Sequence, residues 1–204
     1  LSHRTMKRSI IYLLVAFTPV FPKNLSLESR LNPPARELMD VEIFGNIMII
    51  PGNLDGYDFF NISDPTNPVH LSNIEVPMGN RALSGFWVKA KDSVAYFSSR
   101  TRGNGSAIVN FSTPSSPAMV GSLSFEGINI QNPSLEGLDV FGNVLAVAAH
   151  EDGVLFYDIE NSMAPEPFYQ FECGNAWDVE FIDSHYLAIG DGENGLIIYG
   201  YDCV

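Results

Sequence analysis

Acidic side chains occupy one aligned position in three of four short segments, where together they could hold a cation. Each segment alternates between apolar and polar residues: VEIF from Val41, WVKA from Trp87, LDVF from Leu138 and DVEF from Asp178. Alignment of the segments gives one equivalent position occupied by Glu42, Lys89, Asp139 and Glu180, and Asp178 stands two residues before Glu180 on the same face. Converging carboxylates repel one another, so partial burial would raise a pKa or recruit a divalent cation such as Ca²⁺. The competing interpretation, which we favour, is that these side chains are solvated and line a wet channel.

Other chemical motifs give no catalytic centre. The sequence contains no G-x-S-x-G, H-E-x-x-H or phosphate-binding glycine loop. His70, His150 and His185 fall at different places in the pattern, and no two of them have metal-ligand spacing. Loops rich in Asp, Asn and Glu offer oxygen atoms to calcium, best at residues 191–193, but none has the EF-hand pattern. Turn formation explains these loops better than a calcium site does.

The chain repeats itself from Asp40 onward. Four copies align on an Asp-Gly or Asn-Gly pair whose glycines are separated by 49, 48 and 42 residues: Gly56, Gly105, Gly153 and Gly195. A proline follows the glycine by 12 residues in three copies: Pro68, Pro117 and Pro165. A period of this length is typical of propellers and similar arrays.

Each copy predicts four short strands and no helix. An alternating strand is followed by an almost wholly apolar strand, a turn that needs positive φ, a β-branched and aromatic strand, and a Pro-containing loop before an outer strand. We therefore predict an all-β fold, a β-propeller-type array of about 3.5 four-stranded blades. The expected repeats are 40–84, 85–136, 137–176 and an incomplete 177–204. We expect part of a longer propeller, and the alternative is a small ring closed by the lead-in segment.

The first residues predict export. A basic pair after Met6 precedes the apolar run IIYLLVAF, which is too short for a membrane span. We interpret residues 1–5 as upstream read-through, 6–23 as a signal peptide and 24–39 as a lead-in to the repeats. The mature chain is thus expected in the periplasm, at the cell surface or outside the cell, without membrane insertion.

The composition of the chain disfavours some classes of binding partner. The net charge of −13 disfavours nucleic acid and anionic membranes, which need clustered cations. Export would permit a disulfide between Cys173 and Cys203, and two free thiols are the alternative. Trp87 and Trp177, near the starts of two alternating strands, could stack on a sugar or a peptide at the channel mouth, although core packing between blades explains them better.

The segment DFFNISDPTNP, from Asp58 to Pro68, has a weaker copy in YDIENSMAP, from Tyr157 to Pro165. These two segments resemble the LVIVD-repeat proteins, a group of propeller-like exported proteins of bacteria and archaea. The lead-in PARELMD, from Pro34 to Asp40, is also similar to the start of the ordered domain in such proteins. The resemblance covers roughly residues 35–202. It implies a propeller-like exported fold and says little about activity.

These observations predict a non-catalytic protein that binds or scaffolds protein or glycan at the cell envelope. The alternative is a metal-assisted propeller hydrolase or lactonase whose cation is held by the aligned carboxylates: Glu42, Asp139, Asp178 and Glu180. Bound metal that is lost on Glu180→Ala would distinguish the enzyme from the binding module.

Overall fold

The protein is described by a computed structural model that covers residues 26–35, 37–78, 81–100, 105–130 and 133–201. Within these ranges the chain forms strands, turns and loops without a helix, which confirms the all-β prediction. The same residues provide no helix of the length and apolarity that a membrane crossing requires.

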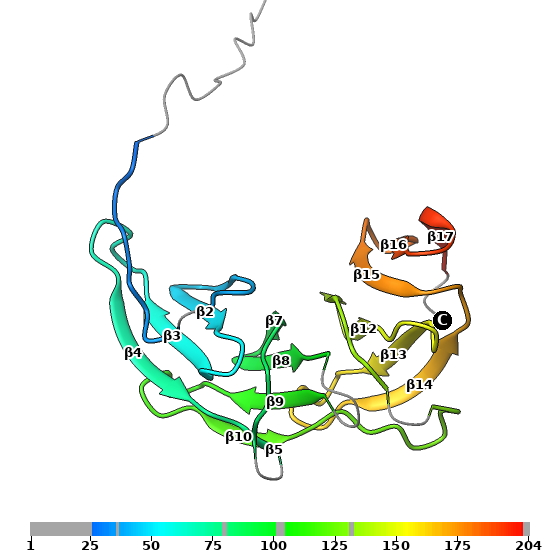
Figure 1. The fold of residues 1–204 in the computed structure, drawn as a ribbon, viewed down its shortest axis with the longest axis horizontal. Coiled ribbons are helices and arrows are strands. Elements are labelled where there is room, and N and C mark those ends of the chain that lie inside the picture. The colour runs from blue at the N-terminus through cyan, green and yellow to red at the C-terminus, as the bar shows by residue number, and fades with distance from the viewer. Residues whose placement is uncertain (1–25, 36, 79–80, 101–104, 131–132, 202–204) are drawn as a thin grey trace, which may run out of the picture.

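Four antiparallel sheets follow one another along the chain (Figure 1). Sheet 1 contains β1 (Glu42–Phe44), β2 (Ile47–Pro51), β3 (Tyr57–Asn61) and β4 (Val69–Ile74). Sheet 2 contains β7 (Trp87–Lys91), β8 (Val94–Ser98), β9 (Ser106–Asn110) and β10 (Ala118–Gly121). Sheet 3 contains β11 (Leu138–Phe141), β12 (Val144–Ala148), β13 (Val154–Asp158) and β14 (Glu166–Phe171). Sheet 4 has three described strands, β15 (Ala176–Phe181), β16 (Tyr186–Asp191) and β17 (Gly195–Gly200), and a short ribbon of β5 (Pro77–Met78) and β6 (Arg81–Ala82) joins sheets 1 and 2.

The repeated glycine marks the turn that leads into the third strand of a sheet. Gly56 and Gly153 have φ of +85° and +78°, a region that residues with a Cβ rarely adopt. A Cβ at Gly153 would also lie 2.0 Å from the carbonyl oxygen of Phe171 on the neighbouring strand. Gly195 has φ of +80°, so in sheets 1, 3 and 4 the repeated glycine supplies a backbone conformation that the turn needs.

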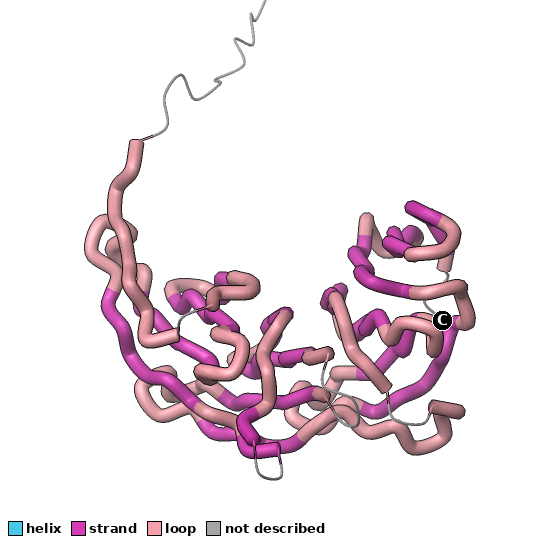
Figure 2. The backbone as a smooth tube through the Cα atoms, in the orientation of Figure 1, coloured by secondary structure: helices cyan, strands magenta, loops and turns pink. Residues whose placement is uncertain are grey.

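The sheets are arranged along an open arc, with their first strands on its inner side (Figures 1 and 2). Consecutive first strands contact one another, β1 with β7, β7 with β11 and β11 with β15. The fourth strands β4, β10 and β14 lie on the outer side (Figure 1). Residues at equivalent positions of the first strands consequently face a common inner region.

Apolar side chains fill the space between each sheet and the next. Tyr57 of sheet 1 stacks on Phe97 of sheet 2, with ring centroids 3.8 Å apart. Tyr96 and Leu145 belong to the core between sheets 2 and 3, and Phe156 belongs to the core between sheets 3 and 4. Since alternate residues of a strand face opposite sides, the middle strands are apolar on both faces.

The lead-in segment lies along sheet 1. Ala35 is buried, and a Cβ added to Gly52 would meet it at 2.3 Å. The backbone N–H of Met39 donates to the carbonyl of Pro51 (3.0 Å), and the hydroxyl of Ser29 donates to the carbonyl of Pro65 (2.9 Å). These contacts fix the described part of the lead-in against the first sheet.

Close packing between sheets 1 and 2 predicts a specific intolerance at Gly85. A Cβ there would lie 2.0 Å from Cε1 of Tyr57, a ring that is fully buried and cannot move away from Phe97. Gly85→Ala should lower the free energy of unfolding by about 1–3 kcal/mol. Urea denaturation measures this change. Gly121→Ala, whose Cβ would meet no atom within 4 Å, is the control and should change stability by less than about 0.5 kcal/mol; equal effects would contradict the packing argument.

Candidate functional site

The structure brings three of the aligned side chains together at the inner side of the arc. Lys89 on β7 extends its ammonium between two carboxylates of the following sheets. Its Nζ lies 3.1 Å from Oδ1 of Asp139 on β11 and 3.6 Å from Oε2 of Glu180 on β15. The ammonium of Lys89 thus stands where the alignment suggested a bound cation, and Lys89, Asp139 and Glu180 form an ion-paired cluster.

Carboxylates at the inner side also link sheet 1 to β7 and β11 to β15. The backbone N–H of Val88 donates to Asp40 Oδ2 (3.0 Å), and that of Phe181 donates to Asp139 Oδ2 (2.8 Å). Glu42 Oε1 accepts a longer bond from the N–H of Ala90 (3.3 Å). Because first strands are the inner edges of their sheets, these bonds satisfy backbone donors that would otherwise lack a strand partner. The side chains therefore have a structural function.

The pKa values of Glu42 and Lys89 are both raised in this cluster, for different reasons. Burial raises the pKa of Glu42, and the nearby charges of Asp40 and Asp139 add to this rise, although Lys89 and the N–H of Ala90 counteract it. Burial by itself would lower the pKa of Lys89. The carboxylates of Asp139, Glu180 and Glu42 outweigh that effect, so its pKa is raised. The cluster stabilises the charged form of the lysine.

Asp178 has a different role. Its Oδ1 accepts a hydrogen bond from the N–H of Val179 (2.9 Å), next to it in sequence. The side chain lies against Gly137, where an added Cβ would be 1.9 Å from the same oxygen. Gly137 stands two residues before Asp139, at the position that Asp178 occupies relative to Glu180. The glycine in sheet 3 therefore makes room for the aspartate of sheet 4.

The loop at residues 191–193 uses its acidic group to form a turn. Asp191 is buried and accepts the backbone N–H groups of Gly174 (2.8 Å), Asn175 (3.2 Å), Glu193 (2.8 Å) and Asn194 (2.9 Å). Burial would raise its pKa, but these donors outweigh burial and hold the pKa of Asp191 well below its usual range. Its two oxygens are thus engaged by the backbone. Within the described residues, no three His, Cys, Asp or Glu side chains are grouped so that they could hold a metal ion.

Cys173 adjoins the same turn. Burial, together with the charge of Asp191, raises the pKa of its thiol to about 11. Cys203, its predicted disulfide partner, lies outside the described residues.

A second polar cluster, centred on a buried carboxylate, connects sheets 2, 3 and 4. The side chain of Glu136, just before β11, is fully buried. Its Oε2 accepts a hydrogen bond from Arg100 Nε (2.9 Å), and its Oε1 lies 2.5 Å from His150 Nε2 without the geometry of a hydrogen bond. His150 Nδ1 contacts Oδ1 of Asn175 at 3.1 Å.

Aromatic rings surround the arginine of this cluster. Cζ of Arg100 lies 5.3 Å from the ring centroids of Phe86, Trp87 and Trp177. The ring of His150 makes an edge contact with Trp177 at 4.7 Å. We call the group formed by Phe86, Trp87, Arg100, Glu136, His150 and Trp177 the arginine cluster.

The sequence singles out both tryptophans, with core packing as the better explanation, and gives no sign of Arg100 as their partner. Arg100 comes two residues after the end of the apolar second strand of its repeat, and Glu136 is a single acid between Leu135 and a glycine. A lone acid in an apolar context signals a buried charge that needs a cation. The sequence does not show which cation, because Arg100 and Glu136 are 36 residues apart and adjoin different sheets.

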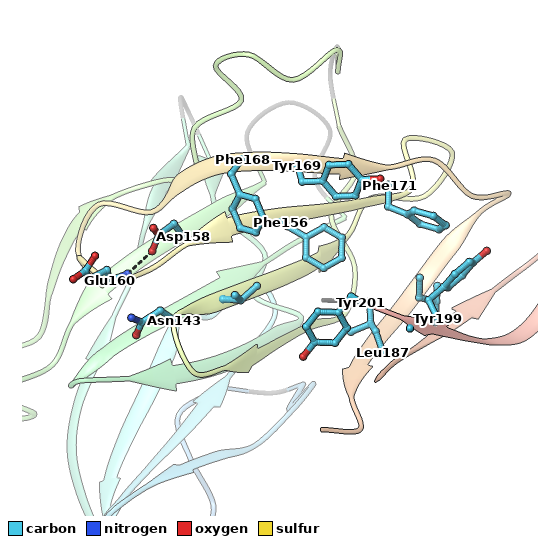
Figure 3. Close-up of a pocket in the computed structure, with 13 residues that line it drawn as sticks. Asn143, Phe156, Asp158, Glu160, Phe168, Tyr169, Phe171, Leu187, Tyr199 and Tyr201 are labelled. Carbon is cyan, nitrogen blue, oxygen red and sulfur yellow. Dashed lines mark hydrogen bonds between the residues drawn. The ribbon is translucent and has the colours of Figure 1, made fainter. Parts of the chain in front are cut away.

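A larger, mainly apolar pocket lies between the outer parts of sheets 3 and 4 (Figure 3). Its volume is about 770 Å³, and its walls include Phe156, Phe168, Phe171, Leu187 and Tyr199. Asn143, Asp158 and Glu160 lie at one end (Figure 3). The pocket lies beside β17, on the side where the other sheets have a fourth strand.

Removal of the Lys89 cation should destabilise the fold in a pH-dependent way. Lys89→Met should lower the free energy of unfolding by about 1–2 kcal/mol at neutral pH, because Asp139 and Glu42 lose their counter-charge. Without Lys89 the pKa of Glu42 rises further, so the folded state holds a proton that the unfolded state has released. Stability of the variant therefore falls as pH rises above the usual range of glutamate, and the difference from wild type is smallest in acid.

Urea denaturation over a pH series measures this difference. In wild type, the contribution of Lys89 should persist up to the usual lysine pKa and disappear as pH rises through the raised value. Lys89→Arg retains the charge and is the matched control. A loss that is the same at acid and neutral pH would contradict the electrostatic explanation.

Comparisons with known proteins give a likeness of fold. No model of a known protein family matches the sequence, and no curated protein matches it. The chain is similar to the crystal structure of the computationally designed Ika4 protein, with a TM-score of 0.62 and 11% identity over 87% of this chain and 98% of the designed one. It also matches the computationally designed Ika8 protein, with a TM-score of 0.48 and 10% identity over 81% of this chain and 58% of that chain, a score too low to carry an argument. At such identities the likeness to Ika4 shows the fold alone.

Proposed function

We propose that this chain is a non-catalytic, exported repeat protein of the β-propeller type that presents a binding or scaffolding surface to protein or glycan at the cell envelope. The observation that carries the proposal is the state of the polar groups at the inner side of the arc. Asp139 uses one oxygen for Lys89 and the other for the N–H of Phe181. A general base or nucleophile needs a free atom directed at a substrate, and this arrangement commits those atoms to other contacts.

The propeller assignment has three supports. Successive antiparallel sheets each cover the face of the preceding sheet, and their first strands contact one another in order. Three four-stranded sheets and one with three described strands agree with the expected 3.5 units. The resemblance of residues 58–68 and 157–165 to LVIVD repeats adds a family interpretation of the same periodicity.

The metal-assisted hydrolase is less favoured. Its cation would have to displace Lys89 from the carboxylates of Asp139 and Glu180, and the ammonium already supplies the positive charge there. Asp178, a further expected ligand, bonds its own strand instead.

Metal analysis and a binding screen test the proposal together. Protein purified without chelators and dialysed against Ca²⁺ should contain far less than one bound cation per chain, and Glu180→Ala should not change the content. The same protein should show saturable binding to an envelope glycan or protein in a broad screen, and a hydrolase substrate panel should give no turnover.

The exposed Glu151 provides the control substitution, Glu151→Ala. One cation per chain that is lost on Glu180→Ala and retained on Glu151→Ala would overturn the non-catalytic proposal. Absence of any glycan or protein ligand would favour a purely structural array.

Export predicts a defined mature N-terminus. Expression of the full chain in a bacterial host should give a secreted or periplasmic form that begins at residue 24, because a basic pair followed by an apolar run directs secretion. N-terminal sequencing of the fractionated protein measures this. A cytoplasmic product that retains the apolar run would contradict the assigned location and leave the binding function open.

A further inference from the structure

The arginine cluster presents a preorganised guanidinium at an exposed position. Arg100 is about half exposed, with 48% of its side chain accessible, whereas its partner Glu136 is fully buried. Of the side-chain nitrogens of Arg100, Nε bonds a described residue, Glu136, and the two terminal nitrogens bond none of the described residues. These nitrogens form a planar pair of donors that fits the two oxygens of one carboxylate.

The surrounding rings restrict how that guanidinium can move. Phe86, Trp87 and Trp177 each lie 5.3 Å from its Cζ, a distance at which the ring faces attract a cation. His150, which supports Trp177 through an edge contact, has φ of +51°. A side chain that is already ordered loses little entropy when a ligand binds, and strained backbone positions of this kind cluster at ligand sites.

The charges around Arg100 favour a ligand with a single negative charge. Glu136 lies on the buried side of the guanidinium and compensates it only there. The chain as a whole carries −13, so a polyanion would be repelled over most of the surface. One carboxylate on an otherwise neutral molecule avoids that repulsion and satisfies the exposed donors.

The backbone near the rings is already hydrogen-bonded, which argues against an added peptide strand. The N–H of Phe86 donates to the carbonyl of Ser98, and the carbonyl of Trp177 accepts from the N–H of Gly137, each at 3.1 Å. Ala176 and His150 bond each other in both directions. Strand addition needs free backbone groups, so recognition here must depend on side chains.

Trp177 supplies accessible aromatic surface beside the arginine. It is 41% exposed, so a ligand ring could cover it while the opposite side of that ring stays in water. A pyranose has such a ring, with C–H groups on its face and hydroxyl groups at its edge. A uronic acid adds one carboxylate to that ring.

We propose that Arg100 and Trp177 form a binding site for a single uronic acid residue of an otherwise neutral glycan. The guanidinium binds the carboxylate through two parallel hydrogen bonds, and the sugar face covers Trp177. Glu136 and His150 act as positioning residues behind them. The inference rests on the proposed binding function and names the ligand class of that function.

Intrinsic fluorescence offers a direct test, because the chain contains two tryptophans and both belong to the arginine cluster. A disaccharide with one glucuronic acid should change tryptophan emission in a saturable manner. The same disaccharide with glucose at that position should bind at least about tenfold more weakly, since it lacks the carboxylate.

Arg100→Lys keeps the charge and removes the planar fork, so affinity for the uronate should fall about tenfold or more. Arg30→Lys makes the same substitution at an exposed arginine of the lead-in and should leave affinity unchanged. Trp177→Phe should also weaken binding, with Trp87 as the remaining reporter. Urea denaturation of each variant verifies that it is folded.

The inference is overturned if the uronate gives no saturable change, if the neutral disaccharide binds equally, or if Arg100→Lys binds as wild type does. Benzoate or a short peptide with a free carboxyl terminus that binds as tightly as the uronate would also overturn the assignment to glycan. Binding of an envelope ligand that Arg100→Lys leaves intact would remove this site and retain the proposed function. If the chain binds the uronate and proves to be a metal-dependent hydrolase, this site is retained and the proposed non-catalytic function is overturned.

Discussion

Coverage of both apolar faces of each sheet is the constraint on which the structure depends. All five residues of β8 are buried, and so are four of the five residues in β12 and in β13. Such a sheet cannot exist alone in water, because each face requires a neighbour whose apolar residues have the matching alternation. Among the described residues, no neighbouring sheet covers the face of sheet 4 that points away from sheet 3. Leu196 is therefore 75% exposed and Ile198 50% exposed.

Apolar packing leaves polar groups buried between the sheets, and the molecule compensates them with ionic contacts. Glu136 and Asp58 are both fully buried carboxylates, and each has a histidine beside it, His150 and His70. Asp58 is also bonded by Asn73 (3.1 Å), so its partners lie within its own sheet. Glu136 instead has partners from sheet 2 and from the turn after β12. That difference makes the arginine cluster a junction between sheets, and it directs a guanidinium toward solvent.

The local pattern of the sequence determined much of the fold, while the partners of charged groups came only from the structure. Alternation and the repeated glycine predicted the four first strands and their equivalence, since both follow from backbone geometry at a fixed period. The same alignment placed Lys89, Asp139 and Glu180 at one position without showing that the lysine neutralises the acids. Side-chain reach and direction decide that contact, and neither is encoded in spacing. The pairing of Arg100 with Glu136 joins segments 36 residues apart and was not predictable for the same reason.

The pocket, the Lys89 cluster and the arginine cluster differ in how well each could bind a ligand. The pocket of about 770 Å³ lies beside β17, where the other sheets have a fourth strand. Its shape therefore depends on sheet 4 having three described strands. In the Lys89 cluster the ammonium pairs with Asp139 and Glu180, and the second oxygen of Asp139 accepts the N–H of Phe181. Only the arginine cluster combines a buried counter-charge, a fixed guanidinium and accessible donors. Ligand specificity needs polar atoms that are oriented by the protein and left unsatisfied by it, and among these three places Arg100 alone meets both conditions.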